Sequence, residues 1–155
     1  MKTYLPQGDV DLSPLAEIHR TAFVEPWSIQ SLHDLLAAPG TFAIAEEDGF
    51  ILVRAIAEEA EILTLAVKPD GRGRGTGRAL VQAAAGHAHT LGAGRLFLEV
   101  AENNVAACRL YAELGFEVVG RRTGYYVVQA GQRQDALILR SNLPLTPLGK
   151  RSSGG

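Results

Sequence analysis

The glycine-rich segment from residue 72 to residue 78 constrains the fold of this chain more than any other feature. It reads Arg-Gly-Arg-Gly-Thr-Gly-Arg, after a predicted strand over residues 61–67 and before a predicted helix that begins near Thr76. Glycine lets the backbone adopt positive φ angles and approach a ligand closely. Free amides at a helix N-terminus carry about half a positive charge, and arginine adds permanent charge. The order of strand, loop and helix therefore predicts an anion site suited to a pyrophosphate.

The spacing of the glycines decides which phosphate loop this is. A Walker loop ends in Gly-Lys-Ser or Gly-Lys-Thr, which the segment lacks. A Rossmann fingerprint needs the spacing G-x-G-x-x-G, whereas Gly71, Gly73, Gly75 and Gly77 are evenly spaced. The segment does match the pattern Arg/Gln-x-x-Gly-x-Gly/Ala, beginning at Arg72. A turn without a ligand is the alternative interpretation of this loop taken alone.

The hydrophobic pattern divides the rest of the chain into strands and helices. Strands are expected at residues 41–46, 50–57, 61–67, 95–100, 116–121, 125–129 and 134–139. The expected helix caps are Ser13 (before Pro14), Ser28, and either Asn103 or Asn104. Hairpins in the first half imply antiparallel pairing, and alternating strands and helices in the second half imply parallel pairing. The fold class is therefore α/β, a mixed sheet with helices on both faces.

Length and composition indicate a single globular domain. The chain has 155 residues, of which 46% are hydrophobic and 21% charged, close to a globular average. We expect one domain over residues 1–145 and a polar, disordered tail over residues 146–155. No segment has the pattern of a signal peptide, and no apolar run approaches the roughly 18 residues of a membrane span. A cytoplasmic protein without membrane contact follows.

Charge and metal-ligand patterns bear on further classes. The formal net charge of -2 gives no indication of a nucleic-acid partner. The single cysteine, Cys108, excludes an internal disulfide framework and a multi-cysteine metal site. His87 and His89 diverge on a helix, and no histidine pairs with other ligands at metal spacing. We therefore expect no metal, and the sequence does not indicate an oligomeric state.

Several motifs together resemble one known family, the GCN5-related N-acetyltransferases (GNAT). The resemblance runs from about Ser13 to Leu139, and the glycine-rich loop and the segment from Leu110 to Phe116 are typical of the superfamily. Within the superfamily, the sequence looks like the bacterial RimI-type ribosomal-protein-alanine N-acetyltransferases. The motifs that indicate this subgroup are Pro26-Trp27-Ser28, Leu98-Glu99-Val100 and Tyr125-Tyr126. The family fold implies a mixed, mostly antiparallel sheet of six to seven strands flanked by about four helices.

The resemblance also implies acetyl-CoA as the co-substrate and assigns residues to it. Backbone groups of the strand Leu65, Ala66 and Val67 would bind the pantetheine arm, and Asn104 would contact the cofactor near that arm. The loop residues that would hold the pyrophosphate are Arg72, Gly73, Arg74, Gly75, Thr76, Gly77 and Arg78. By the same resemblance, Glu99 is the expected proton acceptor and Tyr111 the expected proton donor.

The chemistry of acetyl transfer fits Glu99 as a base. It lies in an apolar strand, where glutamate is disfavoured, and alternation places it on the face of Phe97, opposite Leu96 and Leu98. A carboxylate in that position is costly unless it is paired or used, and a partly buried carboxylate suits a general base. A solvated glutamate on an edge strand is the alternative.

Tyr111 fits the role of the acid, because a phenol with a pKa of about 10 can protonate a departing thiolate. The alternative is a tyrosine packed in the core beside Leu110 and Leu114. Trp27, Tyr125 and Tyr126 are expected to shape the slot for the acceptor, although ordinary strand packing is the alternative for one of the two tyrosines.

The acceptor amine can be argued from its basicity. An α-amine has a pKa of about 8 and lysine one of about 10.4, so deprotonating lysine at neutral pH costs roughly 3 kcal/mol more. A single moderate base therefore favours an N-terminal α-amine, and the resemblance implies the N-terminal alanine of a small-subunit ribosomal protein. Two alternatives stay open: acetylation of a small amine or a lysine, and a domain that binds acyl-CoA without turnover.

Overall fold

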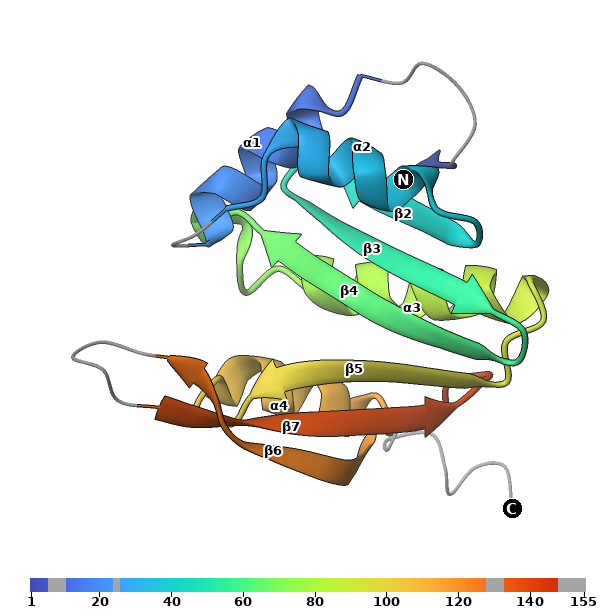
Figure 1. Cartoon of the computed structure of the whole chain (residues 1–155), viewed down its shortest axis with the longest axis vertical. Coiled ribbons are helices and arrows are strands. Elements are labelled where there is room, and N and C mark those ends of the chain that lie inside the picture. The colour runs from blue at the N-terminus through green and yellow to red at the C-terminus, as the bar shows by residue number, and fades with distance from the viewer. Residues whose placement is uncertain (6–10, 24–25, 128–132, 148–155) are drawn as a thin grey trace.

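A seven-stranded mixed sheet forms the centre of the molecule in this computed structural model (Figure 1). The structure describes residues 1–5, 11–23, 26–127 and 133–147, without the side chains of residues 125–127 and 133. The strand order is β1-β2-β3-β4-β5-β7-β6, and every neighbouring pair is antiparallel except β4 and β5. The strands are β1 (Lys2–Tyr4), β2 (Thr41–Glu46), β3 (Gly49–Ile56), β4 (Glu59–Val67), β5 (Arg95–Ala101), β6 (Glu117–Val127) and β7 (Arg133–Asn142).

Four α-helices cover the two faces of this sheet, as the sequence predicts. They are α1 (Ser13–Ala22), α2 (Ile29–Ala37), α3 (Thr76–Thr90) and α4 (Val105–Glu113), and a 3-10 turn, η1 (Pro69–Gly71), lies before α3. Helices α1 and α2 lie over one face and α3 and α4 over the other (Figure 1). The predicted mixed, mostly antiparallel α/β fold is therefore confirmed.

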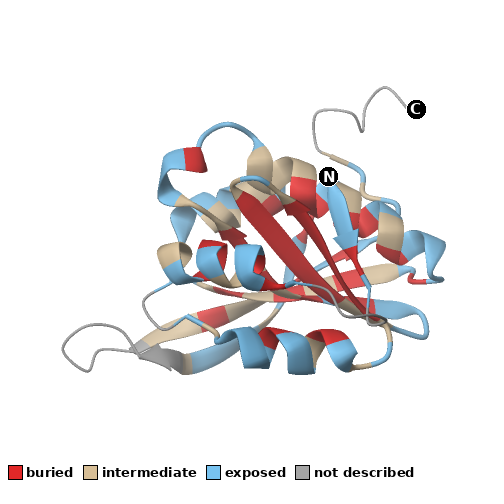
Figure 2. Cartoon of the chain, turned by 90° about the horizontal axis from the view of Figure 1, so that it is seen from above, coloured by how far each residue is buried: buried red, intermediate tan, exposed pale blue. Residues whose placement is uncertain are grey.

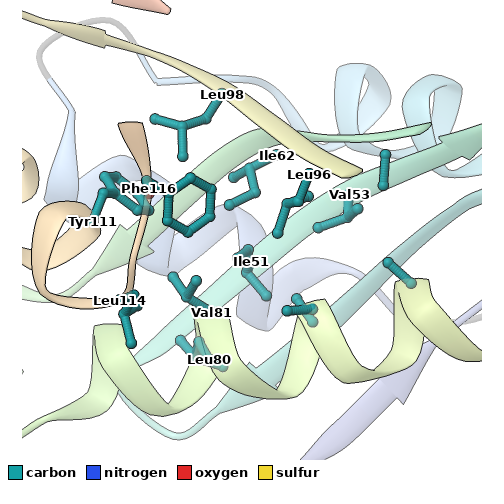
Figure 3. Packing of buried hydrophobic residues seen from close by; sticks show 14 of the residues in the cluster. Ile51, Val53, Ile62, Leu80, Val81, Leu96, Leu98, Tyr111, Leu114 and Phe116 are labelled. Carbon is teal, nitrogen blue, oxygen red and sulfur yellow. The ribbon is translucent and has the colours of Figure 1, made fainter. Parts of the chain in front are cut away.

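The sheet separates two hydrophobic cores, and its central strands are buried between the helices (Figure 2). On the α3 side, Leu80 and Val81 pack against Ile51, Leu96 and Leu114 (Figure 3). Leu80 and Leu96 have no exposed surface, and burying one such side chain contributes roughly 1.5–3 kcal/mol. On the other face of the sheet, residues of α1 and α2 pack against residues of β2, β3 and β4. These two cores fix the positions from which loops and strand ends reach the site.

Capping residues agree with the sequence at two helices and differ at one. Ser28 Oγ accepts the N–H of Ser31 at 3.1 Å, and Asn104 Oδ1 accepts the N–H of Ala107 at 3.2 Å. Ser13 was expected to cap α1 but is its first residue, because the carboxylate of Asp11 accepts the Ser13 N–H at 2.9 Å. The helix therefore begins one residue earlier than the Ser-Pro pattern predicts.

The C-terminal strands correct two further expectations. The predicted strands at 116–121 and 125–129 correspond to one strand, β6, with a register irregularity between Arg122 and Tyr126; residues 128 and 129 lie outside the described residues. Gly124, at φ 63°, absorbs the irregularity, and its N–H donates to Asp135 Oδ1 at 2.8 Å. Parallel pairing, expected throughout the second half, occurs only between β4 and β5, because β7 inserts between β5 and β6.

Candidate active site

A gap between β4 and β5 is the feature around which the candidate residues gather. The two strands pair only from Glu59 with Arg95 to Glu61 with Phe97, and beyond that they diverge (Figure 1). Of the described strands, none pairs with the β5-facing edge of β4 from residue 62 to residue 67. Unpaired strand edges present N–H and C=O groups to any extended ligand. Leu65, Ala66 and Val67 lie on this edge.

The glycine-rich loop lies at the end of β4, between that strand and α3. Gly73 and Gly75 have φ angles of 80° and 81°, and a Cβ at either would meet no atom within 4 Å. In the described part of the chain, the N–H groups of residues 73–78 donate to no backbone carbonyl. Left-handed φ angles at both glycines and the open first turn of α3 make an anion-binding cradle of backbone amides.

The three arginines of the loop differ in their partners. Arg72 Nε donates to the carbonyl of Val67 at 3.2 Å, which ties the loop to the end of β4. Arg78 forms an ion pair with Glu113 and so links α3 to α4. Arg74 lines a cavity of about 500 Å³ beside Glu47 and Asp48 of the turn between β2 and β3. Arg72 and Arg78 are therefore held by the protein itself, and their charges lie at fixed places around the loop.

Gly77, in the first turn of α3, faces side chains of β4 and α4. A Cβ at this position would lie 3.5 Å from Leu110 Cδ2, 3.8 Å from Leu65 Cδ2 and 3.9 Å from Val67 Cγ2. These distances are ordinary van der Waals contacts, so a methyl group would fit, whereas a longer side chain would press against these three residues. The lack of a side chain at residue 77 therefore leaves room beside the free edge of β4.

Glu99 lies on the face of β5 predicted from the sequence, opposite the buried Leu98 and Val100. Its side chain is 24% exposed, and Oε1 lies 3.0 Å from Nη2 of Arg122 on β6. The ion pair crosses β7, since β7 lies between β5 and β6 in the sheet. The carboxylate is thus partly buried and paired, as the cost of burying a charge requires.

Tyr111 lies on the other face of the sheet from Glu99. It is 4% exposed in the core beside α4 and contacts Phe116 edge to face, with ring centroids 5.3 Å apart. Figure 3 shows it close to Leu98 and Leu114. Burial raises the pKa of its phenol. Because Tyr111 and Glu99 lie on opposite faces of β5, a ligand that meets both must enter the gap between β4 and β5.

Asn104 begins α4 beside this gap. Its Oδ1 caps the helix with one lone pair, so its second lone pair, its NH2 group and its backbone remain for a ligand. Its side chain is therefore partly committed to local structure, which the sequence also predicted as a cap.

The predicted acceptor residues lie on separate elements. Trp27 lies just before α2, and its backbone N–H donates to Nδ1 of His19 at 3.0 Å. Tyr125 and Tyr126 are in β6, with Tyr126 opposite Gln134, but their side chains lie outside the described residues. Figure 1 shows the α1–α2 connection and the β6–β7 ends on the two sides of the same gap.

An ionic network anchors the end of β6 next to the gap. Arg121 contacts Glu102, and its Nη1 lies 2.7 Å from Asp135 Oδ2. The Gly124 N–H and the Arg121 guanidinium hold the pKa of the Asp135 carboxyl below its ordinary value of 3.8. Sequence reasoning did not foresee that Arg121 joins this network and Arg122 reaches Glu99. The sequence does not indicate which of two adjacent arginines faces the site. In the structure, strand alternation places Arg121 and Arg122 on opposite faces of β6.

Within the described residues, no helix is long and apolar enough to cross a membrane. Among the same residues, no three histidine, cysteine, aspartate or glutamate side chains gather as a metal site would require.

A split parallel pair, an amide-lined loop at a helix N-terminus and a carboxylate on the neighbouring strand thus lie together in this α/β fold. The family model described as "Acetyltransferase (GNAT) family" matches residues 12–116. The chain belongs to this family, and it is an N-acetyltransferase by its family and relatives.

Several relatives at about 30% identity are named ribosomal-protein-alanine N-acetyltransferases. The Escherichia coli (strain K12) "[Ribosomal protein bS18]-alanine N-acetyltransferase" is 31% identical over 148 residues, covering 90% of this chain and 96% of the relative. The crystal structure of the Escherichia coli ribosomal-protein-S18-alanine N-acetyltransferase superposes with a TM-score of 0.80, 27% identity and coverage of 95% and 96%. Arabidopsis thaliana NAA60 in complex with acetyl-CoA has the same fold, with a TM-score of 0.74, 20% identity and coverage of 92% and 97%.

Proposed function

We propose that this protein transfers the acetyl group of acetyl-CoA to the N-terminal α-amine of a protein that begins with alanine, in a complex of all three partners. The proposed acceptor is the small-subunit ribosomal protein that appears in the name of the Escherichia coli relative, bS18. The observation that carries the proposal is the split between β4 and β5, with the amide cradle of residues 73–78 at one end and Glu99 beside it. The proposal takes residues 1–145 as the catalytic domain and residues 146–155 as a tail.

The loop and the edge of β4 are the proposed cofactor site. Amides of residues 73–78 and the positive end of α3 would hold the pyrophosphate. The free edge of Leu65, Ala66 and Val67 would pair with the amide groups of the pantetheine arm, as an added strand pairs with a sheet. Asn104 would meet the arm near its thiol end. The solved NAA60 structure of this fold contains acetyl-CoA, which supports the same ligand here.

The transfer itself needs two proton movements, and the two faces of β5 offer one group for each. The neutral amine attacks the thioester carbonyl, a C–N bond forms and the C–S bond breaks. Glu99 takes the proton lost by the amine, directly or through a water, and Tyr111 gives a proton to the departing thiolate. Burial raises the pKa of Tyr111, so the phenol is protonated at neutral pH and is also a weaker acid than a free tyrosine.

The acceptor would enter between Trp27 and the end of β6. Its amine must reach Glu99, whose carboxylate lies on the face of β5 that α3 and α4 do not cover. Arg122 orients this carboxylate through the 3.0 Å contact. Trp27, Tyr125 and Tyr126 would form the walls of the slot.

A peptide acetylation screen, read by mass spectrometry, tests the proposal. Short peptides that begin with alanine are compared with the same peptides blocked at the α-amine and carrying one lysine, and with small amines. We expect acetylation of the free α-amine only. Acetylation of lysine or small amines alone would replace the acceptor, and acetyl-CoA binding without turnover of any amine would make the protein a binding domain.

A further inference from the structure

His19 is a buried, uncharged contact on the acceptor side that neither the family motifs nor the chemistry above uses. It lies in the last turn of α1 and is 2% exposed. Its ring stacks on Phe23, with centroids 4.3 Å apart, and on Trp27, with centroids 4.8 Å apart. Phe50 of β3 lies 6.2 Å away on the sheet side. Phe23, just after α1, and Trp27, just before α2, therefore both contact the His19 ring.

The hydrogen bonds of His19 fix its protonation state. The backbone N–H of Trp27 donates to Nδ1 at 3.0 Å. Nδ1 is therefore unprotonated, and the neutral ring carries its proton on Nε2. The carbonyl of His19 accepts the N–H of Phe23 at 3.2 Å. One residue thus holds both ends of the connection between α1 and α2.

Protonation of this ring would remove its only acceptor. Both nitrogens of an imidazolium are donors, so the Trp27 N–H would face another N–H. Burial lowers the pKa of His19 below its ordinary value of 6.5. The aromatic residues packed on the ring carry no charge, and the charged neighbours on its own helix, Glu17 and Arg20, are exposed and paired with each other. A protonated ring would lose the hydrogen bond from Trp27, although its stacking on Phe23 and Trp27 would still attract the positive charge.

Trp27 belongs to the same core as the cofactor strand. It packs against the cluster that contains Ala66 of β4 and Leu15 and Ile18 of α1. Ala66 lies on the edge of β4 that faces the gap. A shift of Trp27 would therefore change the side of the gap where the acceptor is proposed to enter, and leave the loop of residues 73–78 in place.

We propose that His19 is a positioning residue for acceptor binding, which holds Trp27 at the gap while its ring is neutral and releases it when the ring is protonated. This inference rests on the proposed function for its effect on catalysis, but the contact itself can be tested without any acetylation. The protein would then lose acceptor affinity as the pH falls, with its affinity for acetyl-CoA unchanged.

Trp27 is the single tryptophan of the chain, so intrinsic tryptophan fluorescence reports on this contact alone. In the wild type we expect the emission to change with pH, with a midpoint below 6.5 because burial lowers the pKa of His19. In His19→Phe the ring stack is kept and the acceptor is lost; in His19→Asn, Oδ1 replaces Nδ1 as acceptor and nothing titrates. Both variants should lack the pH transition, and His33→Asn on the exposed face of α2 should keep it.

Steady-state kinetics with an alanine peptide then separate positioning from general damage. We expect His19→Phe to raise the acceptor KM roughly tenfold, the size typical of one buried donor left unpaired, with the acetyl-CoA KM unchanged. His19→Asn should recover most of the loss. A wild-type emission that stays constant with pH until the protein unfolds, or an unchanged acceptor KM in His19→Phe, would overturn the inference. If no peptide is acetylated at all, the proposed function fails while the fluorescence still decides whether the contact titrates.

Discussion

The two sides of the gap between β4 and β5 differ in the groups that they present: backbone amides on one side and side chains on the other. The donor side presents backbone groups: the edge of β4 at residues 65–67 that β5 does not pair with, and the N–H groups of residues 73–78, which donate to no backbone carbonyl in the described chain. The acceptor side consists of Trp27 and the end of β6 from residue 121 to residue 126. Three of its described side chains contact partners within the protein: the Trp27 ring stacks on His19, Arg122 pairs with Glu99, and Arg121 pairs with Asp135.

This difference suggests that the donor side binds the cofactor and that the acceptor side selects the acceptor. Backbone amides recognise a pyrophosphate whatever the rest of the ligand is, so the donor side can be shared by a whole family. Paired side chains must be displaced or reoriented by an acceptor, so affinity on that side depends on the particular partner. We therefore expect substitutions on the donor side to change cofactor affinity, and substitutions on the acceptor side to change turnover and acceptor KM.

The largest effect is expected from Glu99→Gln, which removes the proposed base and its ion pair with Arg122. Loss of general-base catalysis should lower kcat by about 100-fold or more, with acetyl-CoA affinity unchanged because Glu99 lies outside the donor side. Stopped-assay kinetics and calorimetric titration with acetyl-CoA measure the two quantities. Glu61→Gln, which removes an exposed carboxylate from the neighbouring strand, is the control. Wild-type turnover of Glu99→Gln at neutral pH would end the assignment of Glu99 as the base.

A second effect should appear on the donor side alone, in Gly77→Leu. The new side chain would lie against Leu65, Val67 and Leu110, beside the free edge of β4 where the pantetheine arm is proposed to pair. It would compete with the arm for this space, so the Kd for acetyl-CoA should rise about tenfold to hundredfold. Gly86→Leu is the matched control, since it lies on the same helix and a Cβ there meets nothing within 4 Å. Equal Kd values for the two variants, measured by calorimetry, would show that the cofactor does not lie beside residue 77.

The smallest effect concerns the network that anchors β6 on the acceptor side. Asp135→Asn keeps an acceptor for the Gly124 N–H and loses the charge that pairs with Arg121. The folded state lowers the pKa of Asp135 below 3.8, so its stabilising effect is present above that value and is lost as the pH falls through the lowered pKa. The variant should therefore melt slightly below the wild type at neutral pH, and the difference should shrink toward pH 4 and below.

Thermal unfolding at several pH values measures this difference. Asp70→Asn in the exposed η1 turn serves as the control and should match the wild type at every pH. A melting difference for Asp135→Asn that is the same at pH 7 and at acid pH would show that the charge of Asp135 does not anchor β6. The acceptor KM of the same variant should rise modestly, which sharpens the contrast with Gly77→Leu.

The sequence by itself determined the class of fold and the position of the glycine-rich loop between a strand and a helix. The glycine spacing, the order of strand, loop and helix, and the apolar alternation around Glu99 are local patterns, and each acts over fewer than about ten residues. Local patterns survive the loss of tertiary information, so the loop, the strand of Glu99 and the caps Ser28 and Asn104 were predicted correctly. The residues assigned to the cofactor and to catalysis remain predictions that the variants above test.

Only the tertiary structure decided the acceptor side. Arg122 and Glu99 are brought together by an inserted strand, β7, whose place between β5 and β6 no local pattern indicates. The bend at Gly124 that made one strand of two expected ones depends on Asp135, eleven residues away. His19 and Trp27 meet because the helix end and the loop fold around a buried ring. Such contacts form between residues that are distant in the chain, so their partners follow from packing and burial, which the order of residues alone does not specify.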